Sequence, residues 1–303
     1  MKKLKLILCL LIACLPLCAQ SDGITLRMMT YNIRHGAGMD DVVDLERQAK
    51  VIQSSQPDVV GLQEVDYIVP RSGRVDETAY FADYLGMYGT FGPAIPLSGG
   101  KYGVAILSKE KPLSVSNTPL PGKEKRTLLV CEFQNYVFAC THLDLEEPNR
   151  LASLDIIIAE ASRWSKPFFI CGDWNDKPNS TLITTMKKDD MFVFLNRLTN
   201  SSSSYTFPAQ NPNRVIDYIA SYGNVVRSIN LRKVIANSVS SDHRPVLVSV
   251  VIDDMTGIVS PVGESEEESA CYDLYGRKCP MNNGRCSMPR GIYIVNGKKK
   301  VVR

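Results

Sequence analysis

The stretch SSDHRPVLVSVVI, residues 240–252, contains the two patterns that decide the fold of this chain. Asp242 and His243 stand side by side just before Pro245, and a continuous apolar run begins at Val246. Such a run, without strict alternation of apolar and polar residues, is typical of a strand covered on both faces. The chain has only three histidines, so one placed beside a carboxylate at the mouth of a buried strand indicates a chemical site.

Other short segments share this strand-like composition. They lie at residues 24–33, 59–65, 102–108, 127–133, 136–143, 167–174 and 215–221. Between them, residues 45–55, 78–85 and 149–164 show the apolar spacing of amphipathic helices, and the last of these follows a favourable helix start at Pro148. The pattern alone predicts a layered α/β fold with mostly buried strands.

Most of these apolar runs are interrupted at or near one end by a carboxylate, an amide or an imidazole. One aspartate in such a place is more often a turn or cap residue than a ligand. Several residues of acid, base and metal-binding types at strand ends instead favour a convergent site. The residues are Asn32, Glu64, His142, Asp173, Asn175, Asp217, Asp242 and His243.

The oxygen-rich members of this set indicate a hard cation. Asn32, Glu64 and Asp242 suit Mg²⁺ or Mn²⁺ better than zinc, which prefers histidine and cysteine. Mg²⁺ usually keeps coordination positions for water and for substrate phosphate. The set therefore predicts phosphoester hydrolysis, in which two imidazoles can donate to phosphate oxygens or the leaving group and a carboxylate can activate water.

The net charge of the chain helps to decide whether its substrate is a nucleic acid. The composition is that of an ordinary globular protein, 44% hydrophobic and 22% charged. Residues 20–254 carry 24 Lys and Arg against 27 Asp and Glu. A protein that binds duplex DNA by neutralising its backbone usually has a basic surface. The charge therefore disfavours a nuclease without excluding one.

The two ends of the chain are expected to lie outside the working domain. Residues 1–19 combine lysines with an apolar run too short for a permanent transmembrane helix, which predicts a signal peptide. A lipobox that leaves a lipid-anchored Cys14 is the alternative. We expect an exported protein that is periplasmic, on the cell surface or secreted, with no permanent transmembrane segment. The working domain is predicted over residues 20–254 and an acidic linker over residues 255–268.

Residues 269–303 form a predicted β module. Its segments YDLYGRKC, at 272–279, and RGIYIVNGKKKVVR, at 290–303, resemble the C-terminal sorting tails of exported bacterial proteins. That resemblance implies contact with export or sorting machinery. The alternative is a basic β-hairpin that turns at Asn296-Gly297.

The cysteines divide by position. Cys131, Cys140 and Cys171 lie in apolar runs and are expected to be buried thiols rather than metal ligands. Three cysteines in the tail permit one disulfide.

Seven motifs occur in an order that identifies a family. The chain resembles the endonuclease/exonuclease/phosphatase superfamily, which includes DNase I-like nucleases, neutral sphingomyelinases and inositol polyphosphate 5-phosphatases. The resemblance spans residues 25–252 and implies a two-layered β-sandwich flanked by helices, with the site at one end of the sheets. The motifs are TYNIRHG, 30–36; GLQEVD, 61–66; YGVAILS, 102–108; THLD, 141–144; GDWND, 172–176; RVIDYI, 214–219; and SDHRPV, 241–246.

The resemblance also implies residue roles. Glu64 is expected to be the main metal-binding carboxylate, with Asn32 and Asp242 on the metal or its waters. Asp173 is expected to activate the attacking water, which Asn175 positions.

In the same way, His243 would contact the scissile phosphate and be oriented by Asp217, and His142 would be the other imidazole facing the phosphate. No covalent intermediate is implied.

Further residues have two interpretations each. Arg71 resembles a position near substrate in small bacterial members, or is a solvated loop arginine. Tyr102 either lines the cleft or packs in the core, and Arg126 is a candidate structural ion-pair partner. Tyr205 and Phe207 are expected to pack under the site loop.

The resulting hypothesis is an exported, Mg²⁺-dependent phosphoesterase that acts on a phosphodiester or phosphomonoester. A lipid headgroup or sugar phosphate is favoured over nucleic acid, with a DNase I-like nuclease as the alternative and a non-catalytic surface binding protein as a third. We expect a monomer with an open cleft.

Overall fold

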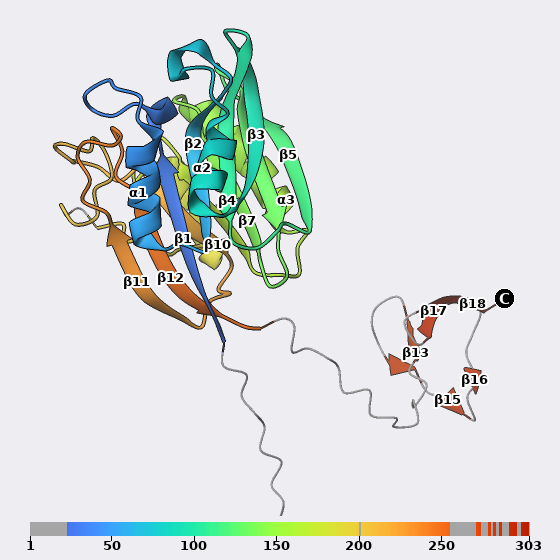
Figure 1. Cartoon of the computed structure of the whole chain (residues 1–303). Coiled ribbons are helices and arrows are strands. Elements are labelled where there is room, and N and C mark those ends of the chain that lie inside the picture. The colour runs from blue at the N-terminus through green and yellow to red at the C-terminus, as the bar shows by residue number, and fades with distance from the viewer. Residues whose placement is uncertain are drawn as a thin grey trace, which may run out of the picture. The chain divides into compact units, whose positions relative to one another are not determined.

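The computed structural model describes residues 23–199 and 201–254, and the backbone of short strands between residues 271 and 302 (Figure 1). The chain divides into two compact units, Met1–Gly257 and Ile258–Arg303. The expected signal peptide, Cys14 and the linker at 255–268 lie outside the described residues, and the predicted domain boundaries stay predictions. Within the described part of the chain, no helix has the length and apolar character needed to cross a membrane.

The first unit contains two six-stranded sheets. In the first sheet the strand order is β11-β12-β1-β2-β4-β3, and only the pairing of β1 with β2 is parallel among the pairs of described strands. Its strands are β1 (Ile24–Asn32), β2 (Val59–Tyr67), β3 (Tyr88–Leu97), β4 (Gly100–Ser108), β11 (Ser228–Val234) and β12 (Val246–Ile252).

The second sheet has the order β5-β6-β7-β8-β10-β9, and here β7 and β8 are the parallel pair. Its strands are β5 (Ser114–Leu120), β6 (Arg126–Glu132), β7 (Val137–His142), β8 (Phe168–Asp173), β9 (Phe192–Phe194) and β10 (Asp217–Tyr222). The two sheets repeat one plan, a parallel pair at the centre with antiparallel strands on both sides.

Three apolar layers hold the sheets and helices together. Between the sheets, fully buried side chains such as Phe138, Phe169 and Val248 form the central core. This layer explains the continuous apolar runs, because the strands that contribute to it are also covered on their other face. The structure thus confirms the predicted two-layered β-sandwich flanked by helices.

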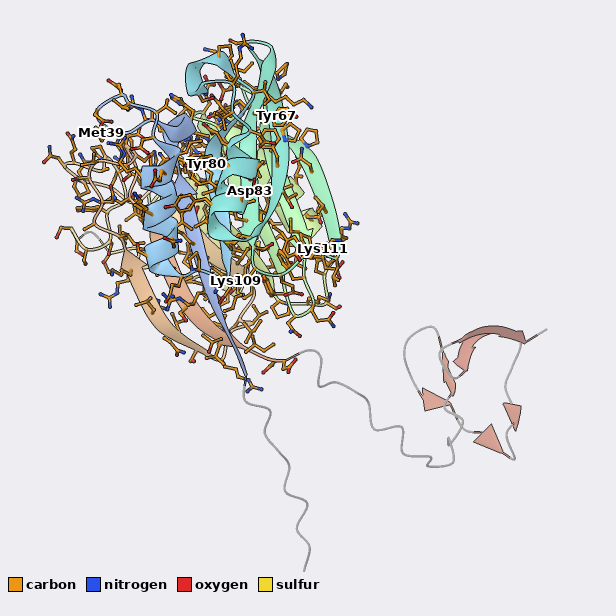
Figure 2. The ribbon with its side chains drawn as sticks, viewed as in Figure 1. Met39, Tyr67, Tyr80, Asp83, Lys109 and Lys111 are labelled. Atoms are coloured by element: carbon orange, nitrogen blue, oxygen red, sulfur yellow. The ribbon has the colours of Figure 1, made fainter. Side chains whose placement is uncertain are left out.

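The helices cover the outer faces of the sandwich. α1 (Leu45–Ser55) and α2 (Glu77–Leu85) pack on the first sheet, and α3 (Glu147–Ala161) and α4 (Thr181–Lys187) pack on the second. α2 shows the amphipathic pattern, with Phe81 fully buried and Asp83 exposed on the outer surface (Figure 2).

Side chains at the starts of several helices satisfy free backbone N–H groups. Asp44, Asp76 and Ser180 each accept a hydrogen bond from the backbone N–H three residues later. α4 was not anticipated from the sequence, because seven residues show too little periodicity.

Cys131, Cys140 and Cys171 are buried free thiols, as expected. Cys140 and Cys171 face each other on β7 and β8 and point toward Gly61 of the opposite sheet. A Cβ atom at Gly61 would overlap the Sγ of Cys171. Glycine is therefore needed there for the two sheets to approach closely under the site.

The topology brings the polar strand ends to one edge of the sandwich. β1 and β2 are parallel and so end together, as do β7 and β8. β10 and β12 run antiparallel to β8 and β1, so their first residues reach the same edge. Asp217, for example, pairs with Asp173 in the sheet register. This register explains why residues far apart in sequence form one site.

The second unit is a small β module, as expected. β13 (Cys271–Asp273), β14 (Lys278–Cys279), β17 (Gly291–Val295) and β18 (Lys298–Val302) form a four-stranded sheet, and β15 (Met281–Asn282) pairs with β16 (Arg285–Cys286). Val295 pairs with Lys298, which agrees with a hairpin at this point. The turn residues 296–297 and the cysteine side chains, and with them the predicted disulfide, lie outside the described residues.

Candidate active site

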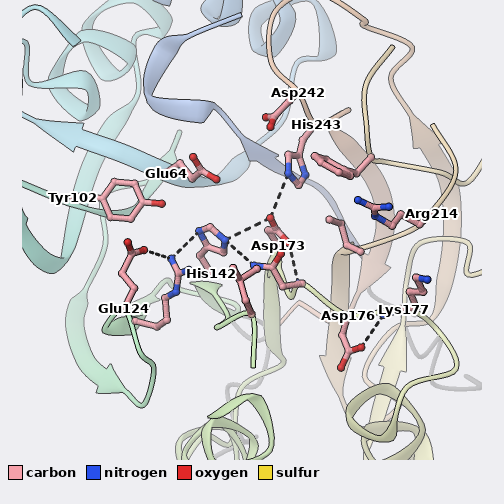
Figure 3. A pocket seen from close by; sticks show the side chains of 15 residues that line it. Glu64, Tyr102, Glu124, His142, Asp173, Asp176, Lys177, Arg214, Asp242 and His243 are labelled. Atoms are coloured by element: carbon pink, nitrogen blue, oxygen red, sulfur yellow. Dashed lines mark hydrogen bonds and ion pairs between the residues drawn. The ribbon is translucent and has the colours of Figure 1, made fainter. Parts of the chain in front are cut away.

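A cleft of about 600 Å³ opens at the edge where the strand ends meet (Figure 3). This volume lies within the range of small-molecule sites. Its lining includes most of the site residues predicted from the sequence. The lining residues are Glu64, Tyr102, Glu124, Arg126, His142, Leu145, Asp173, Asn175, Asp176, Lys177, Phe207, Arg214, Ile216, Asp242 and His243.

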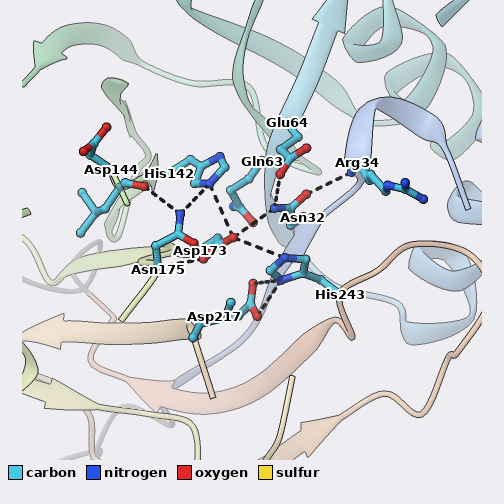
Figure 4. A network of polar contacts seen from close by, with 12 residues as sticks. Asn32, Arg34, Gln63, Glu64, His142, Asp144, Asp173, Asn175, Asp217 and His243 are labelled. Atoms are coloured by element: carbon cyan, nitrogen blue, oxygen red, sulfur yellow. Dashed lines mark hydrogen bonds and ion pairs between the residues drawn. The ribbon is translucent and has the colours of Figure 1, made fainter. Parts of the chain in front are cut away.

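Asp173, the last residue of β8, lies at the centre of the polar network (Figure 4). Its Oδ2 lies 3.1 Å from Nδ2 of Asn32 and 3.5 Å from Nε2 of both His142 and His243. Its Oδ1 accepts a hydrogen bond of 2.9 Å from the backbone N–H of Asn175. Burial raises the pKa of Asp173 to about 7, with His243 opposing this shift. The carboxyl group can therefore act as a base near neutral pH.

His243 lies between two carboxylates. Its Nδ1 is 3.1 and 3.0 Å from the two oxygens of Asp217, and its Nε2 faces Asp173. Burial by itself would lower the pKa of His243, but Asp217 and Asp173 outweigh it and raise the pKa to about 10. The ring is therefore an imidazolium at neutral pH, held in place by Asp217.

His142, the last residue of β7, has the opposite surroundings. Its Nδ1 is 3.4 Å from Nη1 of Arg126, and its Nε2 is 3.0 Å from Nδ2 of Asn175. Burial, and then the positive charges of Arg126 and His243, hold the pKa of His142 well below its ordinary value of 6.5. The ring is therefore neutral at pH 7.

Glu64 enters the cleft through an irregularity in β2. The register with β4 shifts between Gln63 and Val65, and Glu64 has a φ of 59°. A positive φ at a glutamate costs about 1–3 kcal/mol and is typical of functional sites. The bulge points the carboxylate toward the cleft, where Oε1 accepts a hydrogen bond of 2.9 Å from Nδ2 of Asn32.

The donor set on one side of the cleft fits a hard cation. Glu64 and Asp242 both line it, burial raises the pKa of Glu64, and Asp242 adds to this rise. Two carboxylates that repel each other in a shared cleft are the ligands that Mg²⁺ or Mn²⁺ prefers. Asn32 faces Glu64 through its NH₂ group, while its Oδ1 accepts a hydrogen bond of 3.0 Å from the backbone N–H of Arg34.

A second set of potential ligand atoms lies deeper. Atoms of Asp173, Asp217 and His243 all lie within 4.8 Å of one another. His243, however, is protonated on both ring nitrogens, and its Nδ1 forms a hydrogen bond with Asp217. A doubly protonated imidazole has no free lone pair for a metal. The carboxylates of Glu64 and Asp242 therefore suit a cation better than this group does.

Arg71 and Tyr102 stand together at the rim. Nε and Nη2 of Arg71 each lie 2.8 Å from an oxygen of the buried Asp66, and the guanidinium is 5.5 Å from the centroid of the Tyr102 ring. Tyr102 lines the cleft, whereas Arg71 is not among the lining residues and lies over the Tyr102 ring. Asn32 and Asp217 lie directly behind the cleft, within hydrogen-bond distance of the residues that line it.

Arg126 lines the cleft and contacts a site histidine, in addition to the ion pair expected from the sequence. It pairs with Glu124 at 2.8 Å, as an ion-pair partner would, and it also contacts His142. β6 is antiparallel to β7, so the first residues of β6 lie near the last residue of β7. The starts of antiparallel strands, as well as the ends of parallel ones, would have identified this residue.

The aromatic pair at 205 and 207 divides between two places. Phe207 lines the cleft and packs on His243 with ring centroids 4.6 Å apart, and Tyr205 lines an adjoining cavity. Phe207 thus packs on His243, and Tyr205 packs partly buried against the outer apolar layer of the second sheet. Lys177 and Arg214 also line the cleft, and neither was predicted as a site residue, although Arg214 begins the RVIDYI motif.

Comparisons with known proteins agree with this fold. The model of the Endonuclease/Exonuclease/phosphatase family matches residues 29–243. Among curated proteins, none matches the sequence significantly.

Solved structures show the same fold. An endonuclease/exonuclease/phosphatase from Beutenbergia cavernae is 20% identical, with a TM-score of 0.62 over 84% of this chain and 88% of that one. One from Bacteroides vulgatus is 19% identical, with a TM-score of 0.62 over 76% and 100%. A mannosyl-6-phosphatase from Bacteroides thetaiotaomicron is 15% identical, with a TM-score of 0.59 over 75% and 100%.

Proposed function

Because the chain belongs to the endonuclease/exonuclease/phosphatase family, whose members hydrolyse phosphoesters, we propose that it is an exported, Mg²⁺-dependent phosphoesterase that uses water as its nucleophile. One observation carries the proposal. A buried carboxyl group, Asp173, lies between two imidazoles, one positively charged and one neutral. Glu64 and Asp242 line the same cleft. This set would supply a base, two groups that face the phosphate and two ligands for a hard cation.

Glu64 and Asp242 would hold the cation, Mg²⁺ or Mn²⁺, and Asn32 would keep Glu64 in position. A bound divalent cation withdraws charge from phosphate oxygens and orients the phosphate for in-line attack.

Asp173 would accept the proton of the attacking water. Its pKa of about 7 places it near the optimum for a general base at neutral pH. Asn175, whose backbone N–H binds Asp173, would position the water.

The two imidazoles would bind the phosphate from opposite sides. His243 carries a positive charge that Asp217 maintains, so it stabilises the charge that accumulates on the phosphate oxygens. His142 is neutral and offers one N–H. Tyr102 and Arg71 would contact the remainder of the substrate at the rim.

The charge of the domain supports a small substrate. Residues 20–254 carry fewer basic than acidic residues, 24 against 27, whereas nucleic-acid binding usually needs a basic surface. Lipid headgroups and sugar phosphates are therefore favoured over DNA. The fold shared with a mannosyl-6-phosphatase makes sugar phosphates candidate substrates as well.

The test is hydrolysis of bis-p-nitrophenyl phosphate, p-nitrophenyl phosphate, sphingomyelin and plasmid DNA, each with Mg²⁺ or with EDTA. We expect turnover that needs the metal and falls by about 10³-fold in Glu64→Ala, because a metal supplies several kcal/mol of transition-state stabilisation. Glu46→Ala, which changes an exposed helical glutamate paired with Lys50, is the matched control. Equal turnover in EDTA, or unchanged turnover in Glu64→Ala, would refute the proposal.

The same panel separates the alternatives. Degradation of plasmid DNA faster than of the small esters would identify a nuclease. A folded protein that turns over none of the four would favour a non-catalytic binding protein.

A further inference from the structure

A second cavity, of about 540 Å³, adjoins the catalytic cleft and has no part in the mechanism proposed above. Lys177 and Arg214 line both cavities. In Figure 3 these two residues lie at one end of the cleft, opposite Glu124 and Tyr102. Lys177 and Arg214 therefore form the boundary that the two cavities share.

The two cavities differ in charge. The cleft is lined by several carboxylates, including Glu64, Asp173 and Asp242. The second cavity is lined by Lys177, Lys187 and Arg214 and by no acidic residue. Within residues 23–199 and 201–254, the ion pairs formed at up to 4.0 Å include none from these three cations. The cavity therefore holds positive charge that the protein itself does not neutralise.

Lys187 is exposed, and its ammonium group contacts an aromatic ring and a backbone carbonyl. Nζ of Lys187 lies 5.4 Å from the ring centroid of Phe194 and 3.5 Å from the carbonyl oxygen of Pro178. Partial burial lowers the pKa of Lys187, as expected for a cation without a carboxylate partner.

Arg214 is coupled to the catalytic residues through Phe207. Its guanidinium stacks 4.6 Å from the centroid of the Phe207 ring, and that ring packs on His243 at 4.6 Å. Stacking fixes a planar guanidinium in orientation and leaves its N–H groups free to bind oxygen atoms.

We propose that the second cavity, called here the basic subsite, binds a second phosphate group of a small bisphosphorylated substrate whose scissile phosphate lies at His142 and His243. This inference rests on the proposed function and names its substrate class. Lysine and arginine side chains bind phosphate through charge-assisted hydrogen bonds, and an unneutralised cluster of them attracts a dianion.

The shape of the basic subsite favours a small molecule over a nucleic acid. Its volume of about 540 Å³ accommodates a phosphate and part of a sugar-sized body. Its cations gather in one concave site, whereas proteins that bind single strands carry basic residues along an extended groove with stacking aromatics. The polar side chains of Thr199 and Asn213, which also line the subsite, can bind sugar hydroxyls or phosphate oxygens.

The test compares kcat/KM for glucose 1,6-bisphosphate and glucose 6-phosphate, measured as phosphate release in the presence of Mg²⁺. We expect the bisphosphate to be preferred by about tenfold or more, because it gains charge-assisted hydrogen bonds to the subsite. Lys187→Ala should bring the ratio close to one. Lys188→Ala changes the next, exposed lysine, which does not line the subsite, and should leave the ratio as in the wild type.

Other outcomes are equally decisive. Equal kcat/KM for the two sugars in a protein that hydrolyses bis-p-nitrophenyl phosphate would overturn the subsite but keep the proposed function. If no ester is hydrolysed, the proposed function fails, and calorimetric titration with the same two sugars still decides the subsite. Tighter binding of the bisphosphate that Lys187→Ala abolishes would support it, and equal binding would refute it.

A final measurement tests single-stranded DNA as the substrate. Cleavage of DNA with a KM that rises in Lys187→Ala, without discrimination between the two sugars, would assign the subsite to a nucleic-acid backbone and overturn the small-molecule proposal.

Discussion

His243 and His142 lie at the same distance from Asp173, 3.5 Å from Nε2 to Oδ2 in both cases, and both are buried. They differ in the group that faces the other ring nitrogen, which is the carboxylate of Asp217 for His243 and the guanidinium of Arg126 for His142. The pKa of His243 is raised to about 10, while that of His142 is held well below 6.5. Burial opposes the charged form of both rings, so the partner on Nδ1 decides the charge.

Because one ring is charged and the other is neutral, we expect the two rings to stabilise negative charge on a phosphate to different extents. A phosphate gains negative charge on its oxygens as water attacks, and a fixed positive charge stabilises that change more than a neutral donor does. The comparison therefore predicts that the two histidines contribute unequally to catalysis, in an order that mutagenesis can test.

The largest effect is expected for His243→Ala. Removal of the imidazolium also leaves Asp217 buried without its partner, and we expect kcat/KM to fall by about 10³-fold or more, toward the upper end for acid–base groups. The measurement is hydrolysis of bis-p-nitrophenyl phosphate with Mg²⁺, after circular dichroism has shown that the variant is folded. A loss below tenfold would remove His243 from the mechanism.

His142→Ala should have a smaller effect. A neutral donor contributes less to charge stabilisation, so we expect kcat/KM to fall by about 10²-fold, the lower end of the same range. The same assay compares the two variants directly, with Asp155→Asn on the exposed face of α3 as a surface control. If His142→Ala were the more damaging variant, the order predicted from their charges would be wrong.

Asp217→Asn should make His243 resemble His142. The amide keeps the size of the side chain but removes its charge, so the pKa of His243 should fall from about 10 toward its ordinary value. At pH 8 the ring would then be neutral, and we expect kcat/KM to fall by about tenfold to a hundredfold, as for other groups that orient a catalytic residue. Nitrogen chemical shifts of the His243 ring report its protonation, and a ring still charged at pH 8 in this variant would contradict the assignment.

The smallest effect concerns the stability of the metal-free protein. The folded state keeps His142 neutral, whereas in the unfolded chain this residue takes up a proton as the pH falls through 6.5. This contribution of His142 therefore lowers the free energy of unfolding as the pH falls below about 6.5, whereas the raised pKa of Asp173 acts in the opposite direction below about pH 7. His243 adds nothing to this slope, because below 6.5 it is protonated in both states.

His142→Asn should remove the contribution of His142 and keep that of Asp173, so the stability of the variant relative to the wild type should rise as the pH falls below about 6.5. Urea unfolding in EDTA at a series of pH values measures it, with Asp155→Asn as the control. Parallel curves for His142→Asn and wild type would show that the folded protein does not hold this ring neutral.

Prediction of the fold succeeded in the interior of the sheets and failed at their edges. The eight segments expected as strands correspond to the interior strands β1, β2, β4, β6, β7, β8, β10 and β12. The strands that were not predicted from the sequence are the edge strands of the two six-stranded sheets, β3, β5, β9 and β11. Edge strands have one neighbour and more solvent contact, and β3 and β5 contain prolines, so they lack the apolar runs that mark interior strands.

Prediction of the site succeeded for residues at the ends of apolar runs. Their types and their order along the chain sufficed to expect a cleft with carboxylates, an amide and imidazoles. Arg126 and Phe207 were expected only in structural roles. The two lysines of the basic subsite were not anticipated, because Lys177 lies in a loop and Lys187 ends a short helix, both without a distinctive pattern.

The sequence by itself therefore determined the layered fold, the family and the chemical types gathered at one edge of the sandwich, since local apolar patterning and motif order are properties of the chain. Only the tertiary structure decided which side chain faces each ring nitrogen, and hence that one imidazole is charged and the other neutral. The pKa of a buried group depends on charges a few ångströms away, and such neighbours come from distant segments that meet only when the sheets pack.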